Sequence, residues 1–457
     1  MFLAALALTP ALQDLHVTNG STPFAGDNRL LTTLSPNGDG FRDSAVVHFR
    51  LTRRARVELD VVATNMVRAG EGGTSIVWHT SRLFGRGPGT LTWRPARSTQ
   101  PRTYILRLRV GSRVYGAYGP QGRPDAPVVR VQGVDAAFTK RSYAPGEAAD
   151  LRLATDARVL RLQVFAYQSP GRPSEQDVRT SGLAKTGPIR IDWSAHRDRP
   201  ALLRVVRAGD WPSGLYFVRA TSSDGRVGYA PFIVRPRVLG TRRVAVVLAT
   251  NTWAAYNFED ADGDGWGDSW YVSGRHRSVG LERPFLDFGV PFRFRDWDLE
   301  FIAWLNRTGH TVDFLSDDDL DRVPSGDDLA RRYDLVVFPG HEEYVTRHEY
   351  GVIERYRDLG GNLAFLAANN LYRRVDRVFG RYGIEIDGRT DASPPGTQVL
   401  ARIPNLLAGG RSAEMTYYET PAGAKVFAAG VINFGASLGE PAVDRLLTNV
   451  WSRLAVP

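Results

Sequence analysis

Cysteine is absent from all 457 residues of the chain. Without thiols the protein has no disulfide bonds, no thiolate metal ligands and no cysteine nucleophile. Several classes of enzyme and of metal site are therefore excluded. The absence does not fix the compartment, because exported proteins can also lack cysteine.

Lysine is scarce, since only Lys140, Lys185 and Lys425 are present and the net charge of +9 comes almost wholly from arginine. The arginines are spread along the chain instead of being massed in one run. Proteins that bind nucleic acids carry a clustered basic patch or a basic helix face. We therefore expect no nucleic-acid partner.

Long apolar runs are also missing, and none reaches the roughly 18 residues of a membrane-spanning helix. We expect no membrane span. Residues 1–8 (MFLAALAL) resemble the core of a secretory signal, but no basic residue precedes them and Pro10 cuts the run short. The N-terminal segment 1–29 therefore holds either a truncated signal peptide or an ordinary first strand. A secreted or cell-surface location is expected, and a cytoplasmic one stays open.

The length predicts two or three domains, because single cores stop growing near about 250 to 300 residues. Residues 30–132 and 133–238 show short runs of alternating apolar and polar residues between glycine, proline and serine breaks. This pattern is typical of β-sandwiches. The string SPNGDG at residues 35–40, followed by a Trp strand and a Tyr strand, resembles the immunoglobulin-like modules related to flagellar hook-capping proteins.

Strand and helix patterns alternate from residue 241 to residue 457. Residues 244–249 form a buried-strand run, and residues 298–310 have apolar positions at helical spacing before Gly309. Thr346 and Glu349 form a capping box at the start of another helix. Regular alternation predicts a doubly wound, mostly parallel sheet.

Two polar, aromatic strings follow apolar strands of this predicted sheet. Residues 250–257 read TNTWAAYN, and residues 339–344 read PGHEEY. Ligands of open α/β sheets bind beyond the carboxyl ends of the strands, so we expect the two strings to face each other. His341, Glu342 and Glu343 are candidate acids and bases, with Tyr344 and Tyr256 beside them. The alternative is a solvated loop whose acids favour a helix N-terminus.

A second candidate site is the acidic string DADGDGWGD at residues 260–268. Its carboxylates resemble the first nine positions of a calcium loop. Position twelve is Tyr271 where an EF-hand needs a glutamate, so an EF-hand is rejected and a looser calcium loop or a flexible acidic turn remains. The candidate ligands are Asp260, Asp262, Asp264 and Asp268.

Four strings of this region, in order, resemble the C-terminal domain of the large (beta) subunit of N,N-dimethylformamidase and its relatives. They are TNTWAAYN, PGHEEY, DLGGNLAFLAANNLYRRV at residues 358–375 and YYETPAGAKVFAAG at residues 417–430. The resemblance covers about residues 242–457. It implies a class I glutamine amidotransferase-like fold and amide hydrolysis.

The same resemblance implies a mononuclear iron held by two tyrosines and one glutamate. On the matching strings the tyrosines are Tyr256 and Tyr344. The glutamate is Glu385 as first choice and Glu419 as second. Iron would polarise an amide carbonyl and acidify water, with His341, Glu342 or Glu343 as general base.

The chain also departs from that pattern. Relatives read GHDEYW where this chain has Glu342 and Val345, and the acidic string at residues 260–268 is additional. At the position of a nucleophile elbow stand Asn369 and Asn370, which cannot attack a carbonyl, so water is the expected nucleophile.

Two functional hypotheses follow from the sequence. The first is a metal-dependent hydrolase that acts on the C–N bond of a small amide. The second is an exported or cell-surface protein that binds a ligand or glycan through a catalytically inactive amidotransferase-like domain. An oligomer is compatible with either hypothesis.

Overall fold

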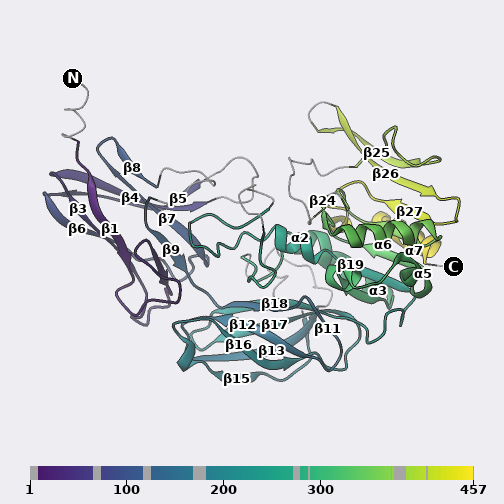
Figure 1. The fold of residues 1–457 in the computed structure, drawn as a ribbon, viewed down its shortest axis with the longest axis horizontal. Helices are drawn as coiled ribbons and strands as arrows, with labels where there is room; N and C mark the ends of the chain where they lie inside the picture. Colours follow the sequence, from purple (N-terminus) through teal and green to yellow (C-terminus); the bar gives the residue numbers. More distant parts are fainter. Residues whose placement is uncertain are drawn as a thin grey trace.

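A computed structural model describes residues 9–64, 74–116, 125–167, 182–270, 278–286, 289–371, 373–374, 387–407 and 410–455. Two β-sandwiches and a mostly parallel sheet with helices follow one another along the chain (Figure 1). The protein is therefore multidomain and rich in β-sheet, as the sequence predicts. None of the described helices combines the length and the apolar character needed to cross a membrane.

The first sandwich consists of two sheets whose inward residues share one core. One sheet has the order β1 (Leu12–Thr18), β3 (Ala45–Leu51), β6 (Gly87–Trp93). The other has the order β2 (Leu31–Leu34), β9 (Val128–Val131), β7 (Arg102–Val110), β4 (Ala55–Thr64), β5 (Thr74–Phe84), and β8 (Arg113–Tyr115) pairs with β7. Strand β1 lies before residue 30, where the sandwich was expected to begin, because its alternating side chains complete the core against β3.

The second sandwich repeats the strand order of the first. One sheet has the order β10 (Asp135–Phe138), β12 (Ala148–Ala154), β16 (Ala201–Arg207). The other has the order β11 (Ser142–Tyr143), β18 (Val227–Val234), β17 (Gly214–Ser222), β13 (Val159–Tyr167), β14 (Gly182–Ala184), and β15 (Ile189–Asp192) pairs with β13. In both sandwiches a short strand runs parallel to the last strand, as β2 does with β9 and β11 with β18.

A tyrosine corner occurs in each sandwich. Tyr104 Oη donates to the carbonyl oxygen of Gln100 at 2.9 Å, and Tyr216 Oη donates to that of Pro212 at 2.7 Å. In immunoglobulin-like domains a tyrosine near the start of a central strand bonds back to the backbone in this way. The shared corner and strand order are consistent with two immunoglobulin-like modules.

The third part of the chain is a seven-stranded sheet with the order β20, β19, β21, β23, β27, β26, β25. The first five strands run parallel to one another. Strand β26 pairs antiparallel with β27, and β25 pairs antiparallel with β26. Their bounds are β19 (Val244–Leu248), β20 (Asp313–Ser316), β21 (Leu335–Phe338), β23 (Asn362–Phe365), β25 (Gln398–Leu407), β26 (Arg411–Glu419) and β27 (Lys425–Ala428). A short parallel pair joins β22 (Tyr344–Val345) to β24 (Arg373–Arg374).

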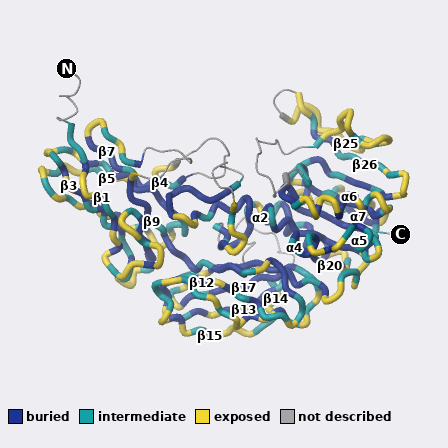
Figure 2. The backbone as a smooth tube through the Cα atoms, in the orientation of Figure 1, coloured by how far each residue is buried: buried dark blue, intermediate teal, exposed yellow. Residues whose placement is uncertain are grey.

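Helices cover both faces of this sheet. The two faces of β19 belong to different cores, since Val246 packs with α3 and α7 while Val247 packs with α4, α5 and α6. All of β19 is therefore buried, whereas the edge strand β25 is largely exposed (Figure 2). The helices are α2 (Thr250–Ala255), α3 (Glu300–Thr308), α4 (Asp317–Asp321), α5 (Gly326–Arg332), α6 (Arg347–Asp358) and α7 (Pro441–Leu454), with a π-helical turn at Arg295–Leu299 and 3₁₀ turns at Ser194–His196 and Gly435–Ser437.

The local signals for these helices are confirmed. The capping box at Thr346 and Glu349 is formed, and Gly309 ends α3 in the left-handed region with φ of 72°. A residue without Cβ adopts that conformation at little cost.

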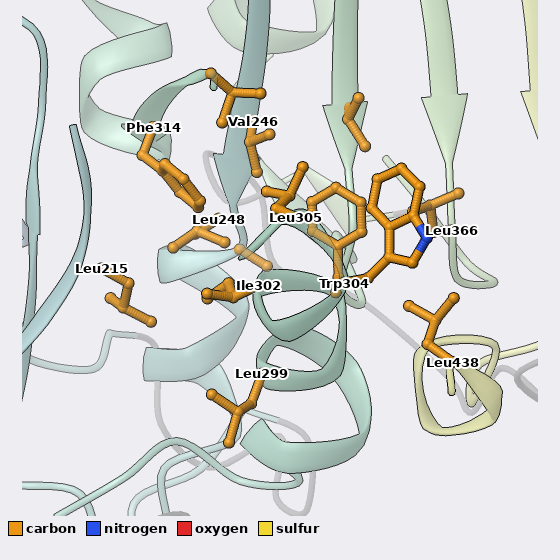
Figure 3. Close-up of a cluster of buried hydrophobic side chains, with 14 of the residues drawn as sticks. Leu215, Val246, Leu248, Leu299, Ile302, Trp304, Leu305, Phe314, Leu366 and Leu438 are labelled. Atoms are coloured by element: carbon orange, nitrogen blue, oxygen red, sulfur yellow. The ribbon is translucent and has the colours of Figure 1, made fainter. Parts of the chain in front are cut away.

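The second sandwich and the sheet share one hydrophobic core. Leu215 of β17 lies in the same cluster as Ile302 and Leu305 of α3 and Phe314 of β20 (Figure 3). The segment near residue 240 therefore links two parts that are packed together and does not separate two independent cores.

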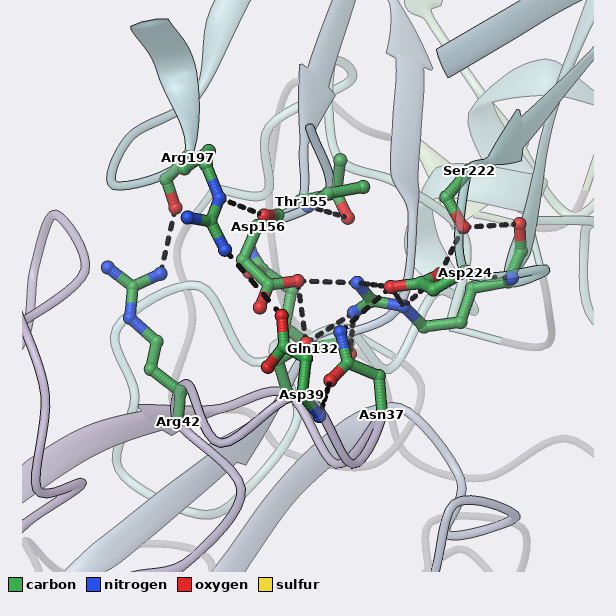
Figure 4. Close-up of polar contacts among 12 residues, drawn as sticks. Asn37, Asp39, Arg42, Gln132, Thr155, Asp156, Arg197, Ser222 and Asp224 are labelled. Carbon is green, nitrogen blue, oxygen red and sulfur yellow. Dashed lines mark hydrogen bonds and ion pairs between the residues drawn. The ribbon is translucent and has the colours of Figure 1, made fainter. Parts of the chain in front are cut away.

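The two sandwiches are joined by a buried polar network that starts in the SPNGDG turn (Figure 4). Arg226 Nη1 donates to Ser35 Oγ and Arg226 Nη2 donates to Asp156 Oδ1, each at 2.5 Å. Ser35 Oγ donates to Asp156 Oδ1 at 2.6 Å, and Asn37 Nδ2 donates to Asp224 Oδ2 at 2.9 Å. Asp156 is fully buried, so its charge depends on these donors.

Replacing Arg226 by Met should lower the stability of the joined sandwiches by about 3 kcal/mol, because the substitution leaves buried Asp156 without its cation. Differential scanning calorimetry would measure the loss. The matched control is Arg204→Met, whose pair with Asp150 is 71% exposed on the arginine side and should contribute far less to stability. Equal losses in the two variants would contradict a central role for this network.

Candidate functional site

The two polar strings lie at the same edge of the sheet. Strands β19 and β21 are parallel neighbours, so α2 after β19 and the loop at residues 339–343 after β21 meet beyond their carboxyl ends. Thr252 of α2 joins them, because its Oγ1 accepts hydrogen bonds from the backbone N–H groups of Glu343 at 3.0 Å and Tyr344 at 3.1 Å. The sequence prediction that the strings face each other agrees with this geometry.

Three side chains form the centre of the site. Tyr256 Oη donates to Glu343 Oε2 at 2.7 Å and lies 3.2 Å from His341 Nε2. His341 Nε2 is also 3.2 Å from Glu343 Oε2. All three residues are buried, at 1%, 1% and 2% exposure for Tyr256, His341 and Glu343. A phenol, an imidazole and a carboxylate therefore converge in a space shielded from bulk water.

The orientation of His341 is fixed from behind. Its Nδ1–H donates a hydrogen bond to the carbonyl oxygen of Ala368 at 2.8 Å. Nε2 therefore faces Tyr256 and Glu343. The indole of Trp297 covers the ring at a centroid distance of 5.0 Å.

Tyr344 belongs to the same buried cluster. Its ring centroid lies 6.2 Å from that of Tyr256 and 5.8 Å from that of Trp270. Two glutamates were predicted as the third iron ligand. Glu385 lies outside the described residues, and Glu419 is 48% exposed and paired with Arg453 at 2.8 Å.

Glu343 is instead the acid beside Tyr256, although the sequence suggested it only as a general base. The signal that would have found this is the spacing of His341 and Glu343. Alternate residues of an extended segment point to the same side, so His341 and Glu343 share one side and Glu342 takes the other. Phenol and carboxylate oxygens with an imidazole nitrogen suit iron, and these side chains fit the metal that the resemblance implies.

Glu342 faces a group of buried acids below the loop. Asp317, Asp298 and Glu349 each contribute to the charge around it, and all four acids are at most 1% exposed. Burial, followed by the charge of neighbouring acids, raises the pKa of Glu342 well above its usual value. Burial also raises the pKa of Asp317 and of Glu349. Part of this group is therefore protonated at neutral pH.

Asp298 is fully buried, and its Oδ2 accepts a hydrogen bond from Trp253 Nε1 at 3.2 Å. Its other oxygen, Oδ1, has no hydrogen-bond partner among the described residues. Burial, with the nearby Asp317, raises the pKa of Asp298 to about 7. An asparagine could keep the bond to Trp253 without carrying a charge.

Asp298→Asn should flatten the dependence of stability on pH. The unfolded chain ionises this carboxyl near pH ~4 and the folded protein near pH 7, so the free energy of unfolding falls as pH rises between these values. Between pH 5 and pH 8 the free energy of unfolding of the variant should therefore rise relative to that of the native protein, by on the order of 2 kcal/mol. Urea unfolding across this range measures the gain. Glu354→Gln, at an exposed position of α6, is the control, and parallel pH profiles for all three proteins would refute the assignment.

The acidic loop at residues 260–268 lies between α2 and the first sandwich. Carboxylate oxygens of Asp260, Asp262 and Asp268 lie within 4.8 Å of one another. Asp260 Oδ2 accepts from Thr103 Oγ1 of β7 at 2.6 Å, which ties the loop to the first sandwich. Asp264 Oδ1 accepts from the backbone N–H of Trp266 at 2.8 Å. Burial, with the charges of Asp264 and Asp262, raises the pKa of Asp260.

Comparison with known proteins places the site in a family context. Residues 193–379 match the family model described as N,N-dimethylformamidase beta subunit-like, C-terminal. The beta subunit of N,N-dimethylformamidase from Paracoccus aminophilus is 40% identical over 75 residues, which cover 16% of this chain and 10% of that protein. The beta subunit from Alcaligenes sp is 39% identical over 79 residues, which cover 17% of this chain and 10% of that protein. The aligned segment thus spans about a tenth of these relatives.

The similarity of this chain to solved structures is weak. The match to CBD12 from CALX1.2 covers 42% of this chain and 79% of that chain at 10% identity, with a TM-score of 0.17. Escherichia coli alpha-2-macroglobulin activated by porcine elastase covers 50% of this chain and 20% of its own at 10% identity, with a TM-score of 0.19.

The family match begins at residue 193, within the second sandwich, and not at residue 242 as the sequence strings suggested. It therefore includes β16, β17 and β18, two of which contribute residues to the core shared with the sheet. It also contains both strings of the site. The resemblance is confirmed in this form: residues 193–379 are similar to the C-terminal region of N,N-dimethylformamidase beta subunit-like proteins.

Proposed function

We propose that this protein is a metal-dependent hydrolase that cleaves the C–N bond of a small amide, with iron as the metal. The observation that carries the proposal is the buried triangle of Tyr256 Oη, His341 Nε2 and Glu343 Oε2, whose sides are 2.7, 3.2 and 3.2 Å. The family match of residues 193–379 supports the reaction class. Assembly with further subunits is part of the proposal, because the aligned relatives are named as beta subunits.

A class I glutamine amidotransferase-like fold belongs to the same proposal. Five parallel strands covered by helices on both faces support it. Asn369, beyond β23, has φ of 55°, a left-handed conformation that suits the sharp turn of a nucleophile elbow. Since Asn369 and Asn370 carry no nucleophile, the attacking group is water.

The residues of the triangle have separate roles in this proposal. Tyr256 and Glu343 would hold the iron, and the ring of Tyr344 on β22 lies beside that of Tyr256. When bound, iron supplies a positive charge that polarises an amide carbonyl and acidifies water. His341, held at Nδ1 by Ala368, presents Nε2 as the group that takes the proton from water and returns it to the leaving amine. Trp297 and Phe292 shield this space from solvent.

Tyr256→Phe tests the metal centre with a change of one oxygen atom. Elemental mass spectrometry should find near-stoichiometric iron in the native protein and about a tenfold lower content in the variant, because a ligand is lost. The rate at which the variant hydrolyses small formamides, followed as release of the amine, should fall together with its iron content. The control is Tyr350→Phe, since Tyr350 lies on α6 and is 46% exposed. Equal iron content and equal hydrolysis in native protein and Tyr256→Phe would refute the proposal.

A calcium ion in the acidic loop is a further part of the proposal. The clustered oxygens of Asp260, Asp262 and Asp268 support it, with Asp264 beside them. Oxygen ligands of this kind suit calcium, whose charge would offset the repulsion among the acids. Because the loop also contacts Thr103 of β7, bound calcium would strengthen the attachment of the first sandwich.

Calcium at millimolar concentration should therefore raise the melting temperature of the native protein by a few degrees. Asp262→Asn should remove most of this shift, and it should leave the calcium-free protein intact because Asp262 is exposed. Asp210→Asn, an exposed acid in the second sandwich, is the control and should keep the full shift. A shift of the same size in both variants would place calcium elsewhere.

A second candidate function is ligand or glycan binding by an exported or cell-surface protein with a catalytically inactive domain. The observation that favours it is the burial of His341, Glu343 and Tyr256, each at most 2% exposed. A protein free of iron, without hydrolysis but with saturable binding of an amide or a glycan, would establish this alternative over the hydrolase.

A further inference from the structure

A cleft of about 630 Å³ lies between the second sandwich and the sheet, and the residues that line it do not include those of the buried triangle. Its volume falls in the range of roughly 300 to 1,000 Å³ that is typical of small-molecule sites. Leu215, Ile302, Leu305 and Phe314 line it, and all four belong to the shared core shown in Figure 3. The apolar part of the lining is therefore formed by side chains that are only 3% to 6% exposed.

Positive charge dominates the rest of the lining. Lys185 and Arg242 line the cleft, and neither side chain has a carboxylate partner among the described residues. Arg237 is 63% exposed and lies 3.5 Å from Asp210, which is 89% exposed. The remaining acid, Asp313, is engaged by Tyr333 Oη at 3.1 Å and by the backbone N–H of Gly240 at 3.1 Å. The side chains of Lys185 and Arg242 are thus available to bind an anion in the cleft.

Aromatic side chains complete the lining. Trp211 stacks on Tyr216 with ring centroids 5.2 Å apart and an interplanar angle of 23°. Tyr167 is only 4% exposed, yet its hydroxyl has no hydrogen-bond partner among the described residues. A buried hydroxyl without a partner costs free energy, and an oxygen acceptor on a ligand would satisfy it.

We propose that this cleft is a second ligand site, which binds a small organic anion with a flat apolar body and a carboxylate or sulfonate group. The apolar body contacts the Leu215 and Phe314 surface, and the anionic group lies near Lys185 and Arg242. None of the lining residues belongs to the triangle of Tyr256, His341 and Glu343, so the site is independent of the proposed hydrolysis.

The test compares two fluorescent probes that share a ring system. 8-Anilinonaphthalene-1-sulfonate carries the anionic group, and N-phenyl-1-naphthylamine lacks it. The full-length protein should bind one sulfonate probe, and N-phenyl-1-naphthylamine should bind much more weakly. Lys185→Gln and Arg242→Gln should each raise the Kd of the sulfonate probe by about tenfold, because each removes a charge-assisted contact, and should leave the neutral probe unchanged.

Arg152→Gln is the matched control, since Arg152 is exposed on β12 and does not line the cleft. Its Kd for the sulfonate probe should equal that of the native protein. Melting curves confirm that each surface substitution leaves the fold intact. The proposal is overturned if Lys185→Gln and Arg242→Gln bind the sulfonate probe as the native protein does, if Arg152→Gln weakens it equally, or if the neutral probe binds as tightly.

Discussion

The parallel pairing of β19 with β21 is the constraint on which the candidate site depends. It brings the start of α2 and the loop at residues 339–343 to one edge of the sheet, where a single hydroxyl, Thr252 Oγ1, receives two backbone N–H groups of the loop. The loop is thereby held in an extended form. That form in turn separates His341 and Glu343 on one side from Glu342 on the other.

Burial then gives the two sides different chemistry. On one side, Glu343 and His341 meet the hydroxyl of Tyr256, so the polar atoms of these three side chains lie within hydrogen-bond distance of one another. On the other side, Glu342 meets only acids, and burial keeps protons on carboxyl groups that would be ionised in water. Adjacent residues of one loop thus have different electrostatic surroundings because of the groups that face them.

Much of this organisation could be predicted from the sequence. Periodicity and capping signals located β3, α6 and α7 closely, because these elements are specified by their own residues. The position of Glu343 beside Tyr256 could not be read in the same way, since it depends on the extended backbone after β21. The start of the first sandwich at β1 was also missed, because an isolated seven-residue strand gains its stability only from pairing with β3. Glu385 lies outside the described residues and stays a prediction.

The core shared by the second sandwich and the sheet has a consequence for how this protein could have been assembled. Leu215 and Phe314 belong to one packed cluster although a linker separates them in the chain. A segment cut at residue 240 would carry an open apolar face on each side, which favours aggregation. The smallest piece that could be inherited or exchanged intact is therefore the second sandwich together with the sheet. The first sandwich has its own core, but its removal would also uncover Asp156 of the polar network and the Phe258 and Trp266 rings that pack against it.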